Sequence, residues 1–304
     1  MSQFNGMKKR LLIILNPKAG RGKGEKIRPK LEEELQEQGI FFEMVQTEYA
    51  GHATKLASEA VGQFDAIVAA GGDGTANEVA HGIARTGAAT MGLIPVGSGN
   101  DFARAMKIPK KLPDSIAILA AGKTKKIDLG LVNGRHFPNG LGIGFDALVV
   151  RESMRIQRLR GLLIYLTAVI KSVFKYESPQ MKLVLDGETR VDDRVFMVTV
   201  GNGISLGGGF ILTPDAQNDD GVFDVCVFHH LTKPKIFWNL PKVFWGGHVK
   251  LKEVNMFRAR EVVIQSNDPV EAHVDGELIA AENGRFHVTL LPHSLEILAP
   301  EGNT

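Results

Sequence analysis

The sequence is poor in cysteine, with only Cys226 among its 304 residues. A single thiol cannot form an internal disulfide, which excludes a disulfide-stabilised secreted fold and favours a reducing cytoplasm. Because Cys226 lies in an apolar, strand-like run, we expect an inert core thiol. No apolar run approaches the roughly 18 residues of a membrane span, and no N-terminal apolar segment has signal-peptide length. We therefore expect a cytoplasmic protein.

The sequence also lacks an excess of charge of one sign. Lysine and arginine number 36 against 34 aspartate and glutamate, a formal net charge of +2, so bulk charge offers no case for nucleic acid as a partner. The nine histidines show no zinc-ligand spacing, and a Ser-His-Asp context is missing, which excludes zinc and hydrolase sites. No glycine stands five residues before a Gly-Lys-Ser/Thr, so a Walker A loop is also excluded.

What is present is a predicted strand, tight loop and helix over residues 64–79. Residues 66–70 are apolar without alternation, as expected of a strand buried on both faces of a parallel sheet. Glycines then allow a sharp turn or a close ligand. Thr75 and Glu78 fit the N-cap and third position of a helical capping box. The loop therefore ends at a helix N-terminus, which is a natural phosphate site.

A second glycine-rich turn, residues 97–101, follows a predicted strand over 91–96. Two such turns on neighbouring strands predict one crevice at the carboxyl ends of a parallel sheet. Asn100 and Asp101 fit helix caps as well as substrate contacts. The predicted phosphate cradle consists of Gly71, Gly72, Asp73, Gly74, Thr75 and Asn77, with Ser98 across the crevice.

Asp73 is the unusual member of this cradle. A carboxylate among phosphates is repulsive unless it holds a cation or accepts a proton, so its presence indicates chemistry beyond anion binding. The alternative is that Asp73 satisfies N–H groups of the turn.

The pattern changes from alternating strands and helices to mostly strands after residue 130. We predict an α/β domain over 1–130 with a parallel, Rossmann-like sheet. Residues 131–293 are predicted to form a mostly antiparallel β-sandwich that carries two helical insertions. The first insertion, 162–174, fits either a core helix or the wall of an acyl-chain slot. The second, 235–250, holds Trp238 and Trp245 among lysines, which fits a membrane-touching surface or packing on the sandwich.

Two acidic segments complete the candidate sites. Asp275-Gly276-Glu277 places two carboxylates beside a glycine, but Asp186-Gly187-Glu188 repeats the triplet where Asp-Gly signals a hairpin turn. The triplet alone is therefore not diagnostic. The loop 215–220 offers oxygen ligands for a hard cation, or is simply an acidic, solvated turn.

Six motifs in order resemble the lipid kinase family that includes bacterial diacylglycerol kinases and sphingosine kinases, with NAD kinases as more distant relatives. The motifs, spread over nearly the whole chain, are Asn16-Pro17-Lys18-Ala19-Gly20, Gly71-Gly72-Asp73-Gly74-Thr75, Gly97-Ser98-Gly99-Asn100-Asp101-Phe102-Ala103-Arg104, Gly144-Phe145-Asp146-Ala147, Asp220-Gly221 and Asp275-Gly276-Glu277. The resemblance implies that Mg²⁺ and ATP bind between two domains and that a last strand, about 294–304, returns to the first domain. It also implies that the domain over 131–293 binds a lipid substrate at the membrane surface, with peripheral association there.

The resemblance further implies residue roles. Thr47 contacts the nucleotide, and the acidic triplet supplies the proton acceptor, with Glu277 favoured as base and Asp275 as its partner, or the reverse. A structural magnesium is held by the Asp220 carboxylate and the carbonyls of Gln217 and Val222. Diacylglycerol is the favoured acceptor. The alternatives are an NAD kinase acting on a soluble dinucleotide and a non-catalytic nucleotide or lipid sensor. A homodimer is left open.

Overall fold

The structure, a computed structural model, describes residues 10–156 and 162–300 and divides into two compact units. Unit 1 runs to Ile127 and resumes at Ser294, and unit 2 spans Asp128–His293. The elements that begin in unit 1 are β1 (Arg10–Leu15), α1 (Ala19–Glu37), β2 (Phe41–Gln46), α2 (His52–Ala60), β3 (Ala66–Gly71), α3 (Asp73–Thr86), β4 (Thr90–Pro95), α4 (Asp101–Ala105), α5 (Leu112–Ala121) and β5 (Thr124–Val132).

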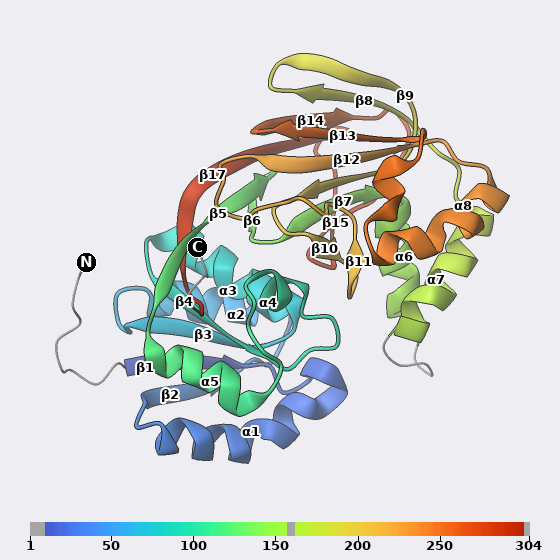
Figure 1. The fold of residues 1–304 in the computed structure, drawn as a ribbon. Helices are drawn as coiled ribbons and strands as arrows, with labels where there is room; N and C mark the ends of the chain where they lie inside the picture. Colours follow the sequence, from blue (N-terminus) through green and yellow to red (C-terminus); the bar gives the residue numbers. More distant parts are fainter. Residues whose placement is uncertain (1–9, 157–161, 301–304) are drawn as a thin grey trace. The chain divides into compact units, whose positions relative to one another are not determined.

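Unit 1 is a parallel sheet between two helical layers (Figure 1). The strand order is β2-β1-β3-β4, and the end of β17 (Arg285–Leu298) adds a parallel strand beside β4. Helices α1 and α5 cover one face, where Leu31 and Ile116 meet Ile13 and Val68. Helices α2 and α3 pack together on the other face. Strand β3 is buried at every residue because both faces are covered, which explains its unbroken apolar run.

Unit 2 is built mostly from antiparallel strands. Its further elements are β6 (Arg135–Phe137), β7 (Gly140–Gly144), α6 (Phe145–Met154), α7 (Leu162–Lys175), β8 (Gln180–Leu185), β9 (Glu188–Gly201), β10 (Ser205–Leu206), β11 (Phe210–Ile211), β12 (Phe223–His229), α8 (Lys233–Asn239), the 3-10 helices η1 (Leu240–Phe244) and η2 (Gly247–Lys250), β13 (Val254–Ala259), β14 (Glu261–Gln265), β15 (Ala272–Val274), β16 (Glu277–Ile279) and most of β17.

The long strand β9 joins two layers of unit 2. One layer has the order β16-β15-β7-β9 with β12 and β13 beyond it, and β9 also pairs with β8, which continues to β14 and β17. Leu141 and Ile143 of β7 and Leu183 of β8 belong to one apolar core together with Val262 and Val288. The predicted fold class, a parallel α/β domain followed by a mostly antiparallel sandwich, is confirmed.

One local prediction was wrong. Helix α3 begins at Asp73 with Gly72 as its N-cap and no side-chain cap, so Thr75 and Glu78 do not form a capping box. The Glu78 carboxylate instead accepts the N–H groups of Gly51 at 2.8 Å and Ala53 at 3.0 Å, at the start of α2. The last strand, expected at about 294–304, is the end of the longer strand β17, which pairs there with β4. Within the described residues, no helix is long and apolar enough to cross a bilayer.

Helix α6 was not predicted. Its sequence shows little helical periodicity because the residues from Phe145 to Val150 are buried except Asp146. A helix covered on most sides has no polar stripe to mark it.

Candidate functional site

The two glycine turns of unit 1 lie in direct backbone contact. A Cβ at Gly97 would stand 2.5 Å from the Cα of Gly72, so a side chain at residue 97 would force the turns apart. A Cβ at Gly71 would stand 2.4 Å from the Thr75 hydroxyl, which accepts a hydrogen bond from Asn16 Nδ2 at 3.0 Å. These glycines therefore serve close packing of the turns at the carboxyl ends of β3 and β4.

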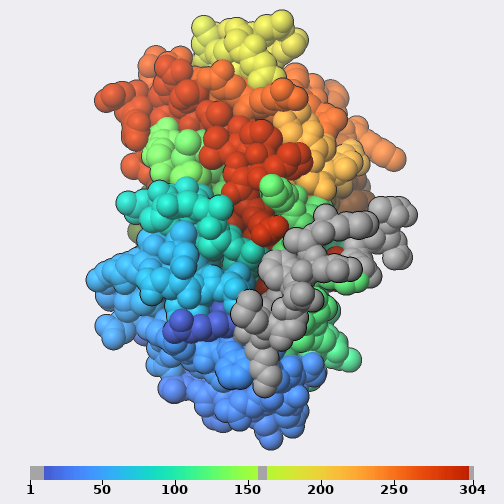
Figure 2. All heavy atoms as spheres, turned by 90° about the vertical axis from the view of Figure 1, so that its left-hand side faces the viewer, coloured from blue at the N-terminus to red at the C-terminus, as the bar shows by residue number. Residues whose placement is uncertain are grey.

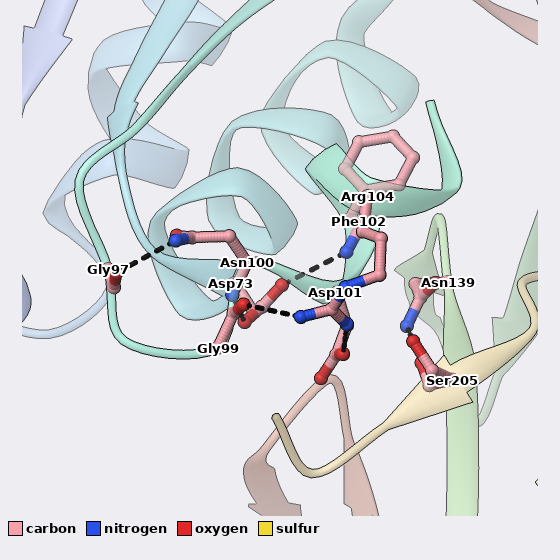
Figure 3. Close-up of polar contacts among 9 residues, drawn as sticks. All are labelled: Asp73, Gly97, Gly99, Asn100, Asp101, Phe102, Arg104, Asn139 and Ser205. Carbon is pink, nitrogen blue, oxygen red and sulfur yellow. Dashed lines mark hydrogen bonds and ion pairs between the residues drawn. The ribbon is translucent and has the colours of Figure 1, made fainter. Parts of the chain in front are cut away.

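Asp73 connects the turns (Figure 3). Its Oδ2 accepts the N–H of Asn100 at 2.7 Å, and its Oδ1 accepts the N–H of Phe102 at 3.1 Å. Burial and, second to it, the charge of Asp101 raise the pKa of Asp73 to about 6, although the backbone N–H groups that it accepts oppose both effects. The alternative interpretation was that Asp73 accepts N–H groups of its own turn. Asp73 does accept backbone N–H groups, but they belong to the second turn.

The second turn is held by its own side chains. Asn100 has a left-handed backbone with φ of 56°, and its Nδ2 donates to the carbonyl of Gly97 at 2.7 Å. Arg104 forms an ion pair with Asp101 and donates to the carbonyl of Gly99 at 3.1 Å. Asn100 and Asp101 therefore act as turn and cap residues in this structure.

The predicted cradle residues differ in exposure. Gly72, Asp73 and Gly74 are partly exposed and Ser98 is exposed, whereas Thr75 and Asn77 are buried. Thr47 follows β2, and its N–H donates to the carbonyl of Leu15 at 2.9 Å. The groups of the cradle that a phosphate can reach are therefore the turn backbone at 72–74 and Ser98.

Asp275 and Gly276 form the two-residue turn of the β15–β16 hairpin. Their φ angles, 49° and 89°, match the 48° and 84° of Asp186 and Gly187 between β8 and β9. Two left-handed residues in a row are typical of a type I′ hairpin turn. The two Asp-Gly-Glu copies thus share one backbone conformation.

The copies differ in their surroundings. Asp275 is buried, and its Oδ1 accepts the N–H of Gly140 at 2.8 Å, while Glu277 pairs with Arg135. Asp186 is exposed in a hairpin that stands out from the surface, yellow in Figure 2. Burial therefore distinguishes the Asp275 turn, the candidate site, from the Asp186 turn, and the sequence alone does not show this difference.

In the loop 217–222 and just beyond it, some carboxylate oxygens have hydrogen-bond or ion-pair partners and others make no hydrogen bond. Asp220 pairs with Arg258, and its Oδ1 accepts the N–H of Val222 at 3.3 Å. The Oδ2 of Asp224 is buried and has no hydrogen-bond partner within the described ranges. Burial raises the pKa of Asp224, Arg258 opposes the shift, and Asp220 and Asp215 add to it. Negative charge exceeds positive charge here, which fits a bound cation.

Asp128 was missed by the sequence prediction. It is fully buried, and its two oxygens accept the N–H groups of Gly221 at 2.8 Å and His293 at 2.7 Å. Its own N–H donates to the carbonyl of Asn218 at 2.7 Å. An aspartate between Ile127 and Leu129 in an apolar strand was the available signal, because a buried carboxylate needs partners.

Unit 2 contains an apolar cavity of about 100 Å³. Its walls come from α6, α7, β9, β12, α8 and η1, and include Tyr165 and Val169 of α7. Helix α7 packs in the core and also borders the cavity, since Val169 belongs to the core cluster and lines the cavity. Trp238 and Trp245 are 81% and 64% exposed, so packing of these tryptophans on the sandwich is excluded.

Comparisons with known proteins agree with this architecture. The diacylglycerol kinase catalytic domain family matches residues 10–132, and the YegS C-terminal NAD kinase beta sandwich-like domain family matches residues 140–299. A diacylglycerol kinase of Staphylococcus saprophyticus is 30% identical, with 97% of this chain and 96% of the relative aligned. A diacylglycerol kinase of Bacillus subtilis is also 30% identical, with 96% and 97% aligned.

Solved structures share the fold. A diacylglycerol kinase from Bacillus anthracis superposes with a TM-score of 0.75 at 24% identity, covering 96% of this chain and 97% of that protein. An NAD kinase from Archaeoglobus fulgidus in complex with ATP gives a TM-score of 0.52 at 12% identity, covering 96% and 94%.

Proposed function

The chain belongs to the diacylglycerol kinase family, lipid kinases that phosphorylate an alcohol, and from this premise we propose that it transfers the γ-phosphoryl group of ATP to a lipid hydroxyl. Diacylglycerol is the acceptor that the names of its relatives favour. The apolar cavity of unit 2 is the observation that favours a lipid acceptor rather than a soluble dinucleotide. An acyl chain fits such a lining, whereas a charged nucleotide would lose its hydration there.

In this proposal the backbone of Gly72, Asp73 and Gly74, with Ser98, binds the triphosphate, and Thr47 contacts the nucleotide. N–H groups at the start of α3 favour negative charge. Asp73 keeps the two turns in register through the N–H groups of the second turn. Magnesium bound with ATP would neutralise charge that develops on the phosphoryl oxygens.

Asp275 is the proton acceptor that the geometry favours. Glu277, the first choice from the sequence, pairs with Arg135, and a guanidinium partner stabilises an ionised carboxylate and makes it a poorer base. Asp275, by contrast, is buried beside Gly140, whose N–H its Oδ1 accepts at 2.8 Å, and burial favours the protonated form of a carboxyl group. We therefore assign Asp275 as the base and Glu277, with Arg135, as the group that fixes the hairpin.

Phosphorylation of a lipid panel tests the function. The protein is incubated with labelled ATP and Mg²⁺ against diacylglycerol and other lipid alcohols in mixed micelles, with NAD as a soluble rival. Label is expected in a lipid product and none in NAD phosphate. Phosphorylation of NAD alone would replace this proposal with the NAD kinase alternative, and ATP binding without turnover on any acceptor would favour a sensor.

The loop 217–222 is the second place where we propose Mg²⁺, held by the Asp220 carboxylate and the carbonyls of Gln217 and Val222. Without nucleotide, Mg²⁺ at 100 times its dissociation constant should stabilise the wild type by about 3 kcal/mol. Asp220→Asn should lose this gain, and Asp186→Asn should keep it. Thermal unfolding with and without Mg²⁺ measures the effect, and equal Mg²⁺ stabilisation of the Asp220 variant would contradict the site.

The exposed tryptophans support a proposed membrane contact. Trp238 and Trp245 lie on the helical segment whose Ile236, Leu240 and Val243 line the cavity. Lys233 lies nearby, with its Nζ 5.7 Å from the centroid of the Phe174 ring, which is itself 63% exposed. Aromatic side chains beside lysines suit the headgroup boundary of an anionic bilayer.

Trp238→Ala/Trp245→Ala should weaken binding to vesicles that contain phosphatidylglycerol by about tenfold or more, since each tryptophan loses apolar contact with the bilayer. Vesicle sedimentation measures the loss. Tyr49→Ala, which removes another exposed aromatic, in unit 1, is the matched control and should bind normally. Unchanged sedimentation of the folded double variant would remove the membrane surface from the proposal.

A further inference from the structure

Tyr49 is an exposed aromatic residue of unit 1 with no role in the nucleotide site described so far. It is 56% exposed, and Phe41, at 51%, has a similar exposure in the same unit. Phe41 opens β2, whereas Tyr49 lies beyond the end of this strand at Gln46. Tyr49 therefore lies at the carboxyl edge of the parallel sheet, which is the edge that carries both glycine turns.

The ring of Tyr49 is held on one face although the residue is exposed. It stacks on the imidazole of His52, with ring centroids 4.5 Å apart and an angle of 10° between the ring planes. His52 is itself fixed, because its Nδ1 accepts the N–H of Glu48 at 3.2 Å and its own N–H donates to the carbonyl of Tyr49 at 3.3 Å. Because more than half of Tyr49 remains exposed, the opposite face of its ring is open to solvent.

Helix α3 fixes the loop that carries this stack. The buried carboxylate of Glu78 accepts the N–H groups of Gly51 at 2.8 Å and Ala53 at 3.0 Å. The Thr54 hydroxyl donates to the carbonyl of Glu78 at 3.0 Å. Helix α3 also begins inside the proposed phosphate cradle. The loop and the cradle are therefore attached to one helix, which restricts the movement of either relative to the other.

Strand β1 lies between the cradle and this loop. The N–H of Thr47 donates to the carbonyl of Leu15 at the end of β1, and Asn16 Nδ2 donates to the Thr75 hydroxyl. Strands β2, β1 and β3 are neighbours in that order, so the ends of β2 and β3 are two strand spacings, or roughly 10 Å, apart. A nucleotide with its phosphates on the turn after β3 can therefore extend its ribose over β1 and bring its base to the loop after β2.

A fixed aromatic ring with one open face is suited to a heterocyclic base. Two flat rings attract each other when they stack, and the ring of Tyr49 is already ordered by His52, so little side-chain entropy is lost when a base binds. Every base has such a face, so stacking holds the base without selecting among bases.

We propose that Tyr49 is the platform on which the base of ATP stacks, and that His52 is the residue that positions this platform. The inference rests on the proposed kinase function and adds the residue that binds the base end of the nucleotide.

Calorimetric titration with Mg²⁺ and the non-hydrolysable ATP analogue AMP-PNP tests the platform without any lipid. Tyr49→Ala should raise the dissociation constant about tenfold or more, since this is the usual strength of stacking between a base and an aromatic side chain. Tyr49→Phe keeps the ring and should stay within about twofold of the wild type. Phe41→Ala is the matched control, because it removes an equally exposed ring from the other end of β2, and it should bind AMP-PNP normally.

Two further titrations separate stacking from a general disturbance of the site. Tripolyphosphate has the phosphates without a base, so wild type and Tyr49→Ala should bind it equally. His52→Ala should weaken AMP-PNP binding in the wild type but have no further effect in Tyr49→Ala, because a positioning residue acts only through the ring that it holds.

An unchanged AMP-PNP dissociation constant in folded Tyr49→Ala would overturn the inference. Equal losses in Tyr49→Ala and Tyr49→Phe would also overturn it, as would a parallel loss of tripolyphosphate binding in Tyr49→Ala. Each of these results leaves lipid phosphorylation by the wild type in place. Failure of the proposed function looks different, since the wild type would then phosphorylate no lipid.

Discussion

Asp275→Asn is expected to lower kcat about 10³-fold, because a general base contributes roughly 10² to 10⁴ to such reactions. Asparagine keeps an oxygen that can accept the N–H of Gly140, so the hairpin should fold. Glu277→Gln is expected to lose less, about tenfold, because it removes the ion pair with Arg135 and leaves the base in place. Steady-state rates at saturating ATP and lipid measure both effects.

The chain supplies a matched control for this prediction. Asp186→Asn changes the same residue of the same turn type, at an exposed hairpin. Asp186 Oδ1 accepts the N–H groups of Arg260 at 2.9 Å and Glu261 at 2.8 Å, so the variant should lose about 1 kcal/mol of stability and no turnover. The assignment of the base is wrong if Asp275→Asn retains near-normal kcat. It is also wrong if Glu277→Gln loses more kcat than Asp275→Asn.

Asp73→Asn is expected to fold and to lose turnover about 10²-fold, because an amide can accept only one of the two N–H groups and turns its NH₂ toward the other. The two glycine turns would then separate, and misplacing a binding loop slightly has effects of this size. Gly97→Ala should lose turnover by a similar factor, since the added Cβ would stand 2.5 Å from the Cα of Gly72 and would also push the turns apart. A normal KM for ATP and a normal kcat in Asp73→Asn would remove Asp73 from the nucleotide site.

The pH dependence of stability tests the environment of Asp73 separately. Its pKa is about 6 in the folded protein, above its ordinary value, so the folded state binds the proton more tightly than the unfolded state. The contribution of Asp73 to stability therefore falls as pH rises from about 4 to about 6, by up to about 3 kcal/mol, and is constant above.

Denaturant unfolding of wild type and Asp73→Asn between pH 4 and 7 measures this difference. The wild type should lose stability relative to the variant across that window. A difference that does not change with pH would show that Asp73 is solvated like an ordinary surface carboxylate.

The sequence by itself determined the fold class and the positions of the turns. Unbroken apolar runs at 11–15 and 66–70 can be satisfied only where both faces of a strand are covered, and glycines directly after β3 and β4 mark the ends of parallel strands. Short-range patterns of this kind depend on neighbours in the chain, so they can be detected without the structure.

The tertiary structure decided which partner each polar side chain uses. Glu78 was expected to cap its own helix but caps α2, and Asp73 binds the second turn across 27 residues of sequence. Two identical Asp-Gly-Glu turns differ because only Asp275 is buried. Local patterns give a residue's conformation, but burial and long-range pairing set its chemistry, and both exist only after the chain has packed.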